Sequence, residues 1–199
     1  MCPREDQALV APDATIGSGT RIWGLAQVRE RAVVGTECTI GRGVYIGPGV
    51  TLGSRVKVQN LAQVYEPATV EDGVFIGPGV VLTNDQYPRA VRPDGEPCSA
   101  ADWEPVGVDL RTGSSIGAGA VCVAPVEVGR WAMVAAGAVV VHDVPDFALV
   151  AGNPARRIGW VGRAGRRLSD DGEGRWRCPV TRELFTETEG RLSEAGDHD

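Results

Sequence analysis

Histidine is scarce in this sequence, where only His142 and His198 occur among 199 residues. Two imidazoles cannot supply the three histidine ligands that one class of catalytic zinc site needs, and His198 is the second-last residue. No apolar run comes near the roughly 20 residues that a membrane-spanning helix requires. These absences exclude a three-histidine metal site and a helical membrane span, so we expect neither a metal nor a membrane partner.

Cysteines are few, odd in number and without metal-type spacing; they are Cys2, Cys38, Cys98, Cys122 and Cys178. This usage favours a reducing, cytoplasmic location. The formal net charge of −6 and the pI of about 5.0 argue against a nucleic-acid partner. The first ten residues contain acids and no apolar run, so we expect no secretory signal.

Glycine is abundant, with 27 residues, and apolar residues recur at every sixth position. The first series runs without a miss through Val10, Ile16, Ile22, Val28, Val34, Ile40, Ile46, Leu52, Val58, Val64, Val70, Ile76 and Leu82. The second series comprises Leu110, Ile116, Cys122, Val128, Val134 and Val140. A small or β-branched residue follows most of these positions by four, and glycine often follows directly.

A fixed six-residue period predicts a parallel β-helix of hexapeptides, because a β-sandwich would alternate with a period of two. Each hexapeptide forms one short strand and a corner, and three of them close one coil. The two series then give about six coils, and the prism is roughly 29 Å tall at the spacing of paired strands. Cys38 and Cys122 occupy core positions, so we expect them to be buried small hydrophobes.

The repeat is interrupted between Leu82 and Leu110, whose separation of 28 is not a multiple of six. The intervening residues are polar and rich in Pro and Asp, so we expect an inserted loop at about 84–109. It is either a solvated loop or one wall of a ligand site. Asn84 and Asp85 stand at the junction, where a rigid scaffold can hold a side chain that still faces solvent.

Four motifs carry a family resemblance, namely TRIW at 20–23, VKVQN at 56–60, TNDQYPRA at 83–90 and DVPDFALVAGNPARRIGW at 143–160. The chain resembles the left-handed β-helix acyltransferases of the hexapeptide-repeat superfamily. More narrowly, it is similar to bacterial N-acetyltransferases of nucleotide-linked 3-amino sugars, over residues 8 to 162 and weakly at CPVTRELF. The resemblance implies an all-β, left-handed fold, acetyl-CoA as co-substrate, and a homotrimer with sites between subunits.

The resemblance also implies site residues. Asn84 would orient the attacking amine, and Asp85 would either accept a proton or stabilise a turn. Tyr87 and Arg89 would bind substrate, with Arg89 facing either a diphosphate or a structural acid. A histidine base is not expected, because Gln27 and Val126 stand where relatives carry histidine, and His142 is expected at the surface.

The CoA side of the site is assigned by the same resemblance. A backbone N–H near Gly117 to Gly119 would polarise the thioester. The adenine and phosphates of CoA would lie near Asn153, Pro154, Arg156 and Arg157; alternatively, these arginines are solvated on a short helix. We expect a β-helix domain at 8–150. The extension at 151–199 would then contain that helix, a linker at 163–175, a hairpin near Trp176 to Glu187, and a frayed end.

Several alternatives stay open. The acceptor could be a sugar hydroxyl or an amino acid, although a hydroxyl would need a base more strongly. The chain could instead be a non-catalytic β-helix subunit, whereas a β-helix carbonic anhydrase is excluded by its need for three histidines. The nucleotide, UDP or dTDP, stays undetermined, as does the pathway, surface-polysaccharide or natural-product biosynthesis.

Overall fold

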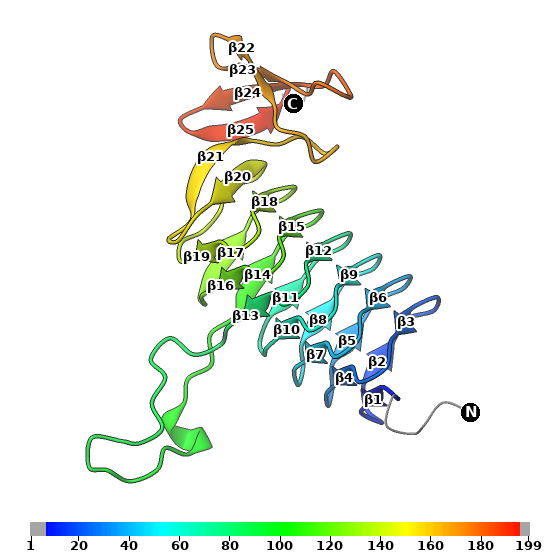
Figure 1. The fold of residues 1–199 in the computed structure, drawn as a ribbon, viewed down its shortest axis with the longest axis vertical. Helices are drawn as coiled ribbons and strands as arrows, with labels where there is room; N and C mark the ends of the chain where they lie inside the picture. Colours follow the sequence, from blue (N-terminus) through cyan, green and yellow to red (C-terminus); the bar gives the residue numbers. More distant parts are fainter. Residues whose placement is uncertain (1–6, 196–199) are drawn as a thin grey trace.

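The computed structural model describes residues 7–195 and contains a left-handed parallel β-helix, which confirms the predicted all-β class (Figure 1). Its coils stack into a prism with three faces. The first face consists of β1 (Leu9–Val10), β4 (Gln27–Val28), β7 (Tyr45–Ile46), β10 (Gln63–Val64), β13 (Val81–Leu82), β16 (Val121–Cys122) and β19 (Val139–Val140).

The other two faces repeat the same arrangement. The second face holds β2 (Thr15–Ile16), β5 (Val33–Val34), β8 (Thr51–Leu52), β11 (Thr69–Val70), β14 (Val108–Leu110) and β17 (Val126–Val128). The third face holds β3 (Arg21–Ile22), β6 (Thr39–Ile40), β9 (Lys57–Val58), β12 (Phe75–Ile76), β15 (Ser115–Ile116), β18 (Met133–Val134) and β20 (Ala148–Ala151). Nearly seven coils result, more than the predicted six, because β20 continues the third face after the hexapeptide spacing ends.

Strand register follows the sequence period. Val64 pairs with Leu82, 18 residues later, whereas Val70 pairs with Leu110, 40 residues later. The insertion therefore adds 22 residues to one coil and leaves the register of the next coil unchanged.

The inward positions are those that the period predicts. From Val28 onward, every predicted core residue is buried, including Cys38 and Cys122. Burial raises the pKa of the Cys122 thiol to about 12, so this thiol stays protonated. Val10 was expected in the core but is 41% exposed, because no coil covers the first one.

Glycine follows many inward residues because consecutive coils touch there. A Cβ built on Gly35 would collide with the backbone of Gly53 in the next coil. At the corner tips the requirement is different: Gly49, for example, has φ of +67°, a conformation that side chains disfavour. The sequence pattern thus reflects both close stacking and left-handed corners.

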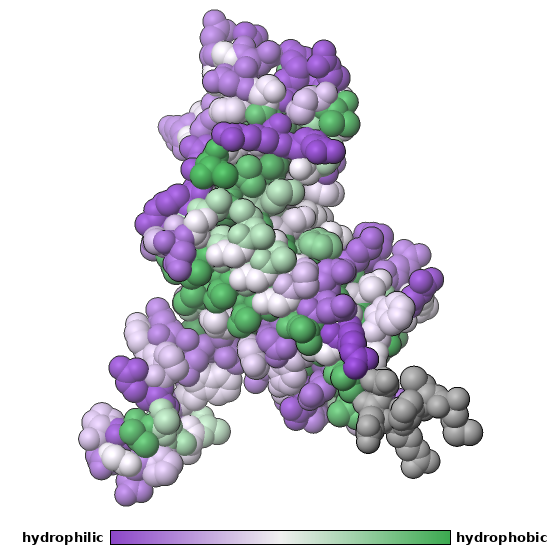
Figure 2. Space-filling model, in the orientation of Figure 1, coloured by the Kyte–Doolittle hydropathy of each residue, from purple (hydrophilic) through white to green (hydrophobic). Residues whose placement is uncertain are grey.

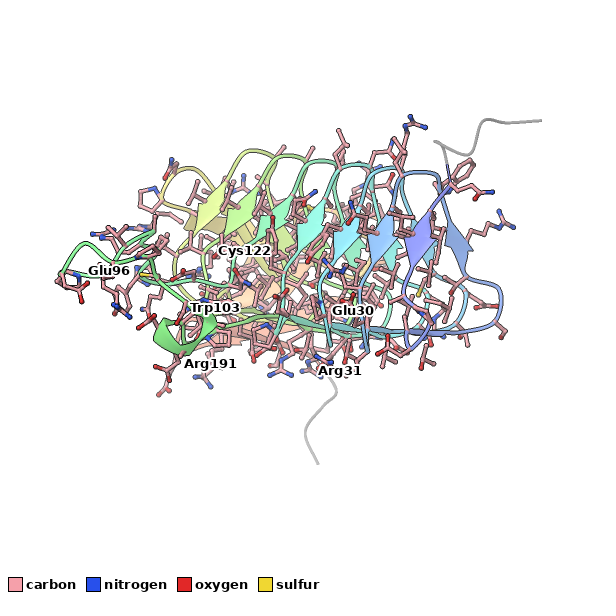
Figure 3. All side chains as sticks on the ribbon, turned by 90° about the horizontal axis from the view of Figure 1, so that it is seen from below. Glu30, Arg31, Glu96, Trp103, Cys122 and Arg191 are labelled. Atoms are coloured by element: carbon pink, nitrogen blue, oxygen red, sulfur yellow. The ribbon has the colours of Figure 1, made fainter. Side chains whose placement is uncertain are left out.

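The inserted loop leaves the prism after β13 and returns at β14. It contains a bridge between Val91 and Pro97 and one short 3₁₀ helix, η2 (Ala100–Asp102), capped by Ser99. The loop stands away from the coils, and from below Glu96 lies beyond the outline of the prism (Figures 1 and 3).

The C-terminal part differs from its prediction except at the expected hairpin near Trp176 to Glu187, where Trp176 pairs antiparallel with Phe185. A strand, β21 (Arg156–Trp160), replaces the expected short helix and pairs antiparallel with β20. The expected linker at 163–175 contains β22 (Ser169–Gly172), and the expected frayed end contains strands. Together β22, β23 (Arg175–Arg177), β24 (Leu184–Thr188) and β25 (Arg191–Glu194) form an antiparallel sheet.

This small sheet packs onto the end of the prism. Phe185 meets Phe147 edge to face at 5.3 Å, and both rings are buried. The Glu187 carboxylate accepts hydrogen bonds from the indole N–H groups of Trp160 and Trp176, each at 2.9 Å. The sheet therefore closes the apolar end that the last coil would otherwise expose.

The prism and the C-terminal sheet differ in the polarity of their surfaces. Apolar side chains gather over the middle of the prism, whereas the C-terminal sheet is largely hydrophilic (Figure 2). Among residues 7–195, no helix is long and apolar enough to cross a membrane.

Candidate active site

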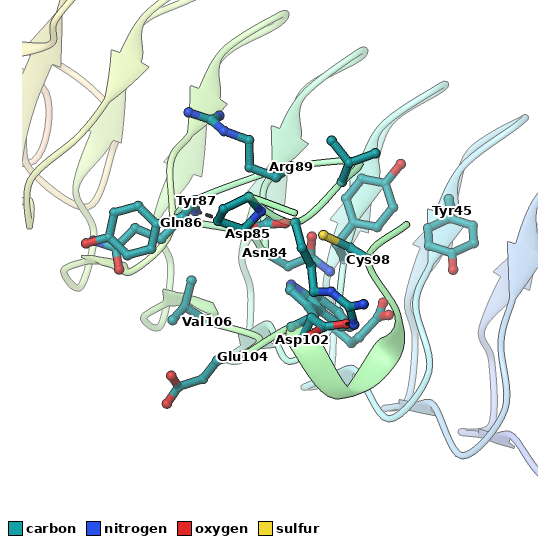
Figure 4. Close-up of a pocket in the computed structure, with 16 residues that line it drawn as sticks. Tyr45, Asn84, Asp85, Gln86, Tyr87, Arg89, Cys98, Asp102, Glu104 and Val106 are labelled. Carbon is teal, nitrogen blue, oxygen red and sulfur yellow. Dashed lines mark hydrogen bonds and ion pairs between the residues drawn. The ribbon is translucent and has the colours of Figure 1, made fainter. Parts of the chain in front are cut away.

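The inserted loop and the edge of the first face enclose a groove with a volume of about 1010 Å³. All four residues that were predicted to bind or orient the acceptor line this groove: Asn84, Asp85, Tyr87 and Arg89. Asn84 and Asp85 lie near its centre, and the Arg89 side chain extends away from Asn84 (Figure 4). One groove thus contains the residues that the sequence singled out.

Asn84 is held at the base of the loop by backbone contacts on both sides. Its carbonyl accepts a hydrogen bond from the Val106 N–H at 3.2 Å, which joins the two ends of the loop. The preceding Thr83 accepts a hydrogen bond at Oγ1 from the Ala124 N–H at 2.9 Å in the next coil. The half-buried Asn84 side chain therefore starts from a fixed backbone.

Asp85 takes part in a turn. Its Oδ1 accepts a hydrogen bond from the Tyr87 N–H at 2.9 Å, an arrangement typical of an Asx turn. Tyr87 is 80% exposed, so its ring is available for a ligand.

Two arginines of the loop have different surroundings. Arg92 lies 3.6 Å from Asp94 and 3.7 Å from Asp102, so its charge is balanced within the loop. The pKa of Asp102 is lowered, chiefly by hydrogen bonds from Ser99. Arg89 donates to the Pro88 carbonyl at 2.9 Å, and within residues 7–195 no ion pair is recorded for it. Arg89 is thus the better placed of the two to bind an anionic ligand.

Part of the groove wall was not predicted from the sequence. Tyr45, Tyr65, Glu66 and Trp103 also line it. The rings of Tyr45 and Tyr65 lie 5.2 Å apart in a tilted pair. The pKa of Tyr45 is raised, first by burial and then by the nearby charge of Glu66.

The six-residue period of the sequence could have identified Glu66 as a neighbour of Asn84. Because Val64 pairs with Leu82, the residues two places later, Glu66 and Asn84, occupy equivalent corners of successive coils. Paired strands are about 4.8 Å apart, so Asn84 and Glu66 are neighbours in this stack.

The residues predicted to bind CoA lie elsewhere. Gly117 and Gly119 form the corner that precedes β16, where the Gly119 N–H donates to the Pro78 carbonyl at 2.9 Å. Gly119 has φ of +66°, and a Cβ built at this position would meet no atom within 4 Å. The Ala155 N–H donates to the Val139 carbonyl at 2.8 Å, so Asn153 and Pro154 border the same edge.

The two candidate phosphate ligands are not equivalent. The Arg157 guanidinium pairs with Glu187 at 3.0 Å and lies 4.1 Å above the Trp160 ring. Arg156 is exposed and donates to the Ala155 carbonyl at 2.9 Å. Arg156 is therefore the better candidate for an anionic ligand.

The acceptor and CoA candidates occupy opposite edges of the first face. Asn84 follows β13, whereas Gly119 precedes β16, the next parallel strand of that face. One subunit therefore does not bring the two groups of residues together.

His142 is exposed, His198 lies outside the described residues, and residues 7–195 contain no cluster of metal-binding side chains.

Known protein families match this chain in its hexapeptide repeats. A bacterial transferase hexapeptide model matches residues 13–48 and 49–84, and a succinyl-transferase hexapeptide model matches residues 113–141. The Aneurinibacillus thermoaerophilus dTDP-3-amino-3,6-dideoxy-alpha-D-galactopyranose 3-N-acetyltransferase is 54% identical over 52 residues, which are 26% of this chain and 27% of that protein.

Two further proteins are similar to parts of the chain. The 2,3,4,5-tetrahydropyridine-2,6-dicarboxylate N-acetyltransferase of Staphylococcus aureus is 58% identical over 43 residues, covering 22% of this chain and 18% of that protein. A hexapeptide-repeat acetyltransferase of Vibrio cholerae, solved with acetyl coenzyme A, shares the fold with a TM-score of 0.50 and 21% identity, covering 77% of this chain and 73% of that one.

The curated relatives are matched over about a quarter of their length or less. The repeat models, in contrast, together match more than half of this chain. The chain therefore belongs to the bacterial hexapeptide-repeat transferase family.

Proposed function

We propose that the protein is an acetyl-CoA-dependent N-acetyltransferase that acetylates the 3-amino group of a dTDP- or UDP-linked amino sugar. The observation that carries the proposal is the groove of about 1010 Å³ that gathers Asn84, Asp85, Tyr87 and Arg89. The name of the Aneurinibacillus relative supports this acceptor, and the Vibrio complex supports acetyl-CoA as the donor.

The reaction needs a neutral amine beside a thioester. Electron-withdrawing oxygens of the sugar lower the pKa of its amine below the ~10.4 of lysine, so a useful fraction is uncharged near neutral pH. The side-chain amide oxygen of Asn84 accepts an N–H hydrogen bond from the amine, which directs the nitrogen lone pair toward the thioester carbon. The departing CoA thiolate, whose thiol has a reference pKa near ~8.5, is the final proton acceptor.

Substrate binding follows from the loop and from the opposite edge. Arg89 pairs with the diphosphate of the nucleotide, and the exposed ring of Tyr87 packs against its base or sugar. On the other edge, Arg156 binds a CoA phosphate, and a backbone N–H of the Gly117 to Gly119 corner stabilises the oxyanion.

A complete site requires a second subunit. The acceptor residues and the CoA residues lie on opposite edges of one face, so an edge of one subunit has to meet the other edge of its neighbour. We propose a homotrimer, in which rotation about a threefold axis repeats this contact three times. The free buried thiols of Cys38, Cys122 and Cys178 agree with a cytoplasmic location.

A smaller, amino-acid-like acceptor is the alternative. The Staphylococcus relative is named as the N-acetyltransferase of a dicarboxylate, and this name contains no nucleotide. The volume of the groove, about 1010 Å³, favours the larger acceptor.

Thiol release from acetyl-CoA tests the proposal. The purified protein is mixed with UDP- and dTDP-linked 3-amino sugars, and separately with small amino acids and amino-dicarboxylates. We expect thiol release with the amino sugars of one nucleotide. Thiol release only with the small acceptors would support the alternative. No thiol release with any acceptor would contradict an acetyltransferase activity.

A further inference from the structure

The C-terminal sheet, at the end of the prism, is tied to β21 by one carboxylate, Glu187 of β24 (Figure 1). Its Oε2 atom accepts hydrogen bonds from the indole N–H groups of Trp160 and Trp176, each at 2.9 Å. Its Oε1 atom accepts one from the Arg157 guanidinium at 3.0 Å. Both oxygens of Glu187 are therefore engaged, and two of the three donors, Arg157 and Trp160, belong to β21.

The strand β21 begins beside the edge of the first face where the CoA candidates lie. The Ala155 N–H donates to the Val139 carbonyl at 2.8 Å, and the Val139 N–H donates to the Gly152 carbonyl at 3.0 Å. Arg156, the first residue of β21, donates to the Ala155 carbonyl at 2.9 Å. The candidate phosphate ligand and the two donors held by Glu187 thus share one five-residue strand.

A β-bulge in β21 turns Arg157 and Trp160 to the same side of the strand. Consecutive residues of β20 pair with Arg157 and Gly159, so Ile158 is an extra residue in β21. Side chains alternate along a strand, and one extra residue lets two positions that are three apart face the same way. Arg156 precedes Arg157 and faces the other side. The anchor on one side of β21 therefore fixes the direction of the candidate phosphate ligand on the other.

The two neighbouring arginines have different electrostatic surroundings. The Arg157 guanidinium is paired with Glu187 and lies 4.1 Å from the centre of the Trp160 ring. Its charge is balanced within the protein. Arg156 is exposed, and within residues 7–195 no ion pair is recorded for it. The Glu187 carboxylate thus holds Arg157 in the fold, while the charge of Arg156 stays available to an anion.

We propose that Glu187 is a positioning residue for acetyl-CoA, because it orients β21 so that Arg156 meets a phosphate of the CoA. The inference rests on the proposed function at one point, which is the contact between Arg156 and that phosphate. Glu187 itself contacts no substrate, since its oxygens are occupied by three donors of the protein. Without its charge, Arg157 is released, β21 loses its fixed orientation, and Arg156 no longer points to the phosphate.

The substitution Glu187→Gln tests this role. The amide oxygen of glutamine can still accept hydrogen bonds from both indoles, whereas its NH₂ group faces Arg157 and cannot pair with it. We expect the KM for acetyl-CoA to rise about tenfold, as for a lost charge-assisted hydrogen bond. The value of kcat and the KM for the amino sugar should stay within about twofold of the wild type.

A shortened donor separates positioning from a general loss of structure. S-acetylpantetheine keeps the thioester and lacks every phosphate of CoA, so Glu187→Gln and the wild type should use it equally well. Glu173→Gln is the matched control, because it removes a carboxylate of the same sheet from its 3.1 Å ion pair with Arg175. We expect the wild-type KM for acetyl-CoA from this control.

Two further variants test the connection to Arg156. Arg157→Gln breaks the same ion pair from the strand, keeps both indole hydrogen bonds, and should raise the KM for acetyl-CoA as Glu187→Gln does, which covers the case that Glu187→Gln does not fold. Arg156→Gln should raise this KM at least as much. The double variant Arg156→Gln/Glu187→Gln should be no worse than Arg156→Gln alone, because residues that act on one contact are not additive.

An unchanged KM for acetyl-CoA in Glu187→Gln or Arg157→Gln would overturn the positioning role. So would an equal loss with S-acetylpantetheine, or additive effects in the double variant. Calorimetric measurement of the Kd for CoA in the same variants needs no acceptor. Wild-type inactivity with every amino sugar would therefore overturn the proposed function alone, and the affinity for CoA would still decide the role of Glu187.

Discussion

Asn84 and Glu66 illustrate how a repeat creates a site from single residues. Both stand two places after a first-face strand, where the other coils carry Pro12, Glu30, Pro48, Ala124 and His142. Register places them on successive coils of one stack, and both line the groove together with residues of the inserted loop. The positions of these two side chains therefore depend more on strand register than on the neighbouring residues in the sequence.

Substitution of Asn84 tests the residue scale. Asn84→Ala removes the oxygen that orients the amine, and misplaced reactants typically cost about 10²-fold in rate, so we expect kcat to fall by that order. The midpoint of thermal unfolding should stay unchanged, because the side chain is half-exposed and outside the core. Gln7→Ala, an amide removed far from the groove, is the control. Unchanged turnover of Asn84→Ala would contradict the role of Asn84.

The inserted loop is an addition to a complete coil. Without residues 85–106, Asn84 would be joined to Gly107, and Leu82 and Leu110 would again be six residues apart. Gly107 would then occupy the position of Gly49, which has φ of +67° in an uninterrupted corner. The sequence on both sides of the loop can therefore form a regular corner by itself.

Deletion of residues 85–106 tests this view at the scale of the element. We expect the shortened chain to keep its β circular dichroism spectrum and a cooperative thermal transition, because the register of the next coil is preserved. Thiol release with the acceptor should disappear, since Tyr87, Arg89 and Trp103 are lost with the loop. An unfolded deletion variant would show that the loop is part of the scaffold, and an active one would show that it is not part of the site.

The strands of the prism could be predicted from the sequence, whereas the strands of the C-terminal sheet could not. The strands of the prism were predictable because each inward residue recurs every six positions and is buried in the same way. The C-terminal sheet was not, because its antiparallel strands have no hexapeptide period and its core depends on contacts such as Phe147 with Phe185. Asn84 was found from the break in the period, whereas Glu66 was missed because only the folded loop makes its corner part of a groove.

At the scale of the whole molecule, the account requires neighbouring subunits to share each site. Asn84 and Gly119 border opposite edges of the first face, so each edge would supply half of the proposed site. Two inactive variants that damage different edges should therefore complement each other in a mixed oligomer.

Mixed oligomers of Asn84→Ala and Ala118→Trp test this requirement. Ala118 is exposed at the CoA edge, so a tryptophan there should block the donor without disturbing the core. After co-expression, random assembly of a cyclic trimer should leave about a quarter of the sites intact, and activity should recover to that fraction. Activity that stays at the level of the separate variants would contradict shared sites.

The most direct measurement of the central claim is kcat/KM for a matched pair of acceptors that carry the same nucleotide and differ only in a 3-amino or a 3-hydroxyl group. The account predicts turnover of the amino sugar, an amide at the 3-position of the product by nuclear magnetic resonance, and no measurable turnover of the hydroxyl sugar. Equal turnover of both acceptors, or an ester product, would contradict an amine-orienting site at Asn84.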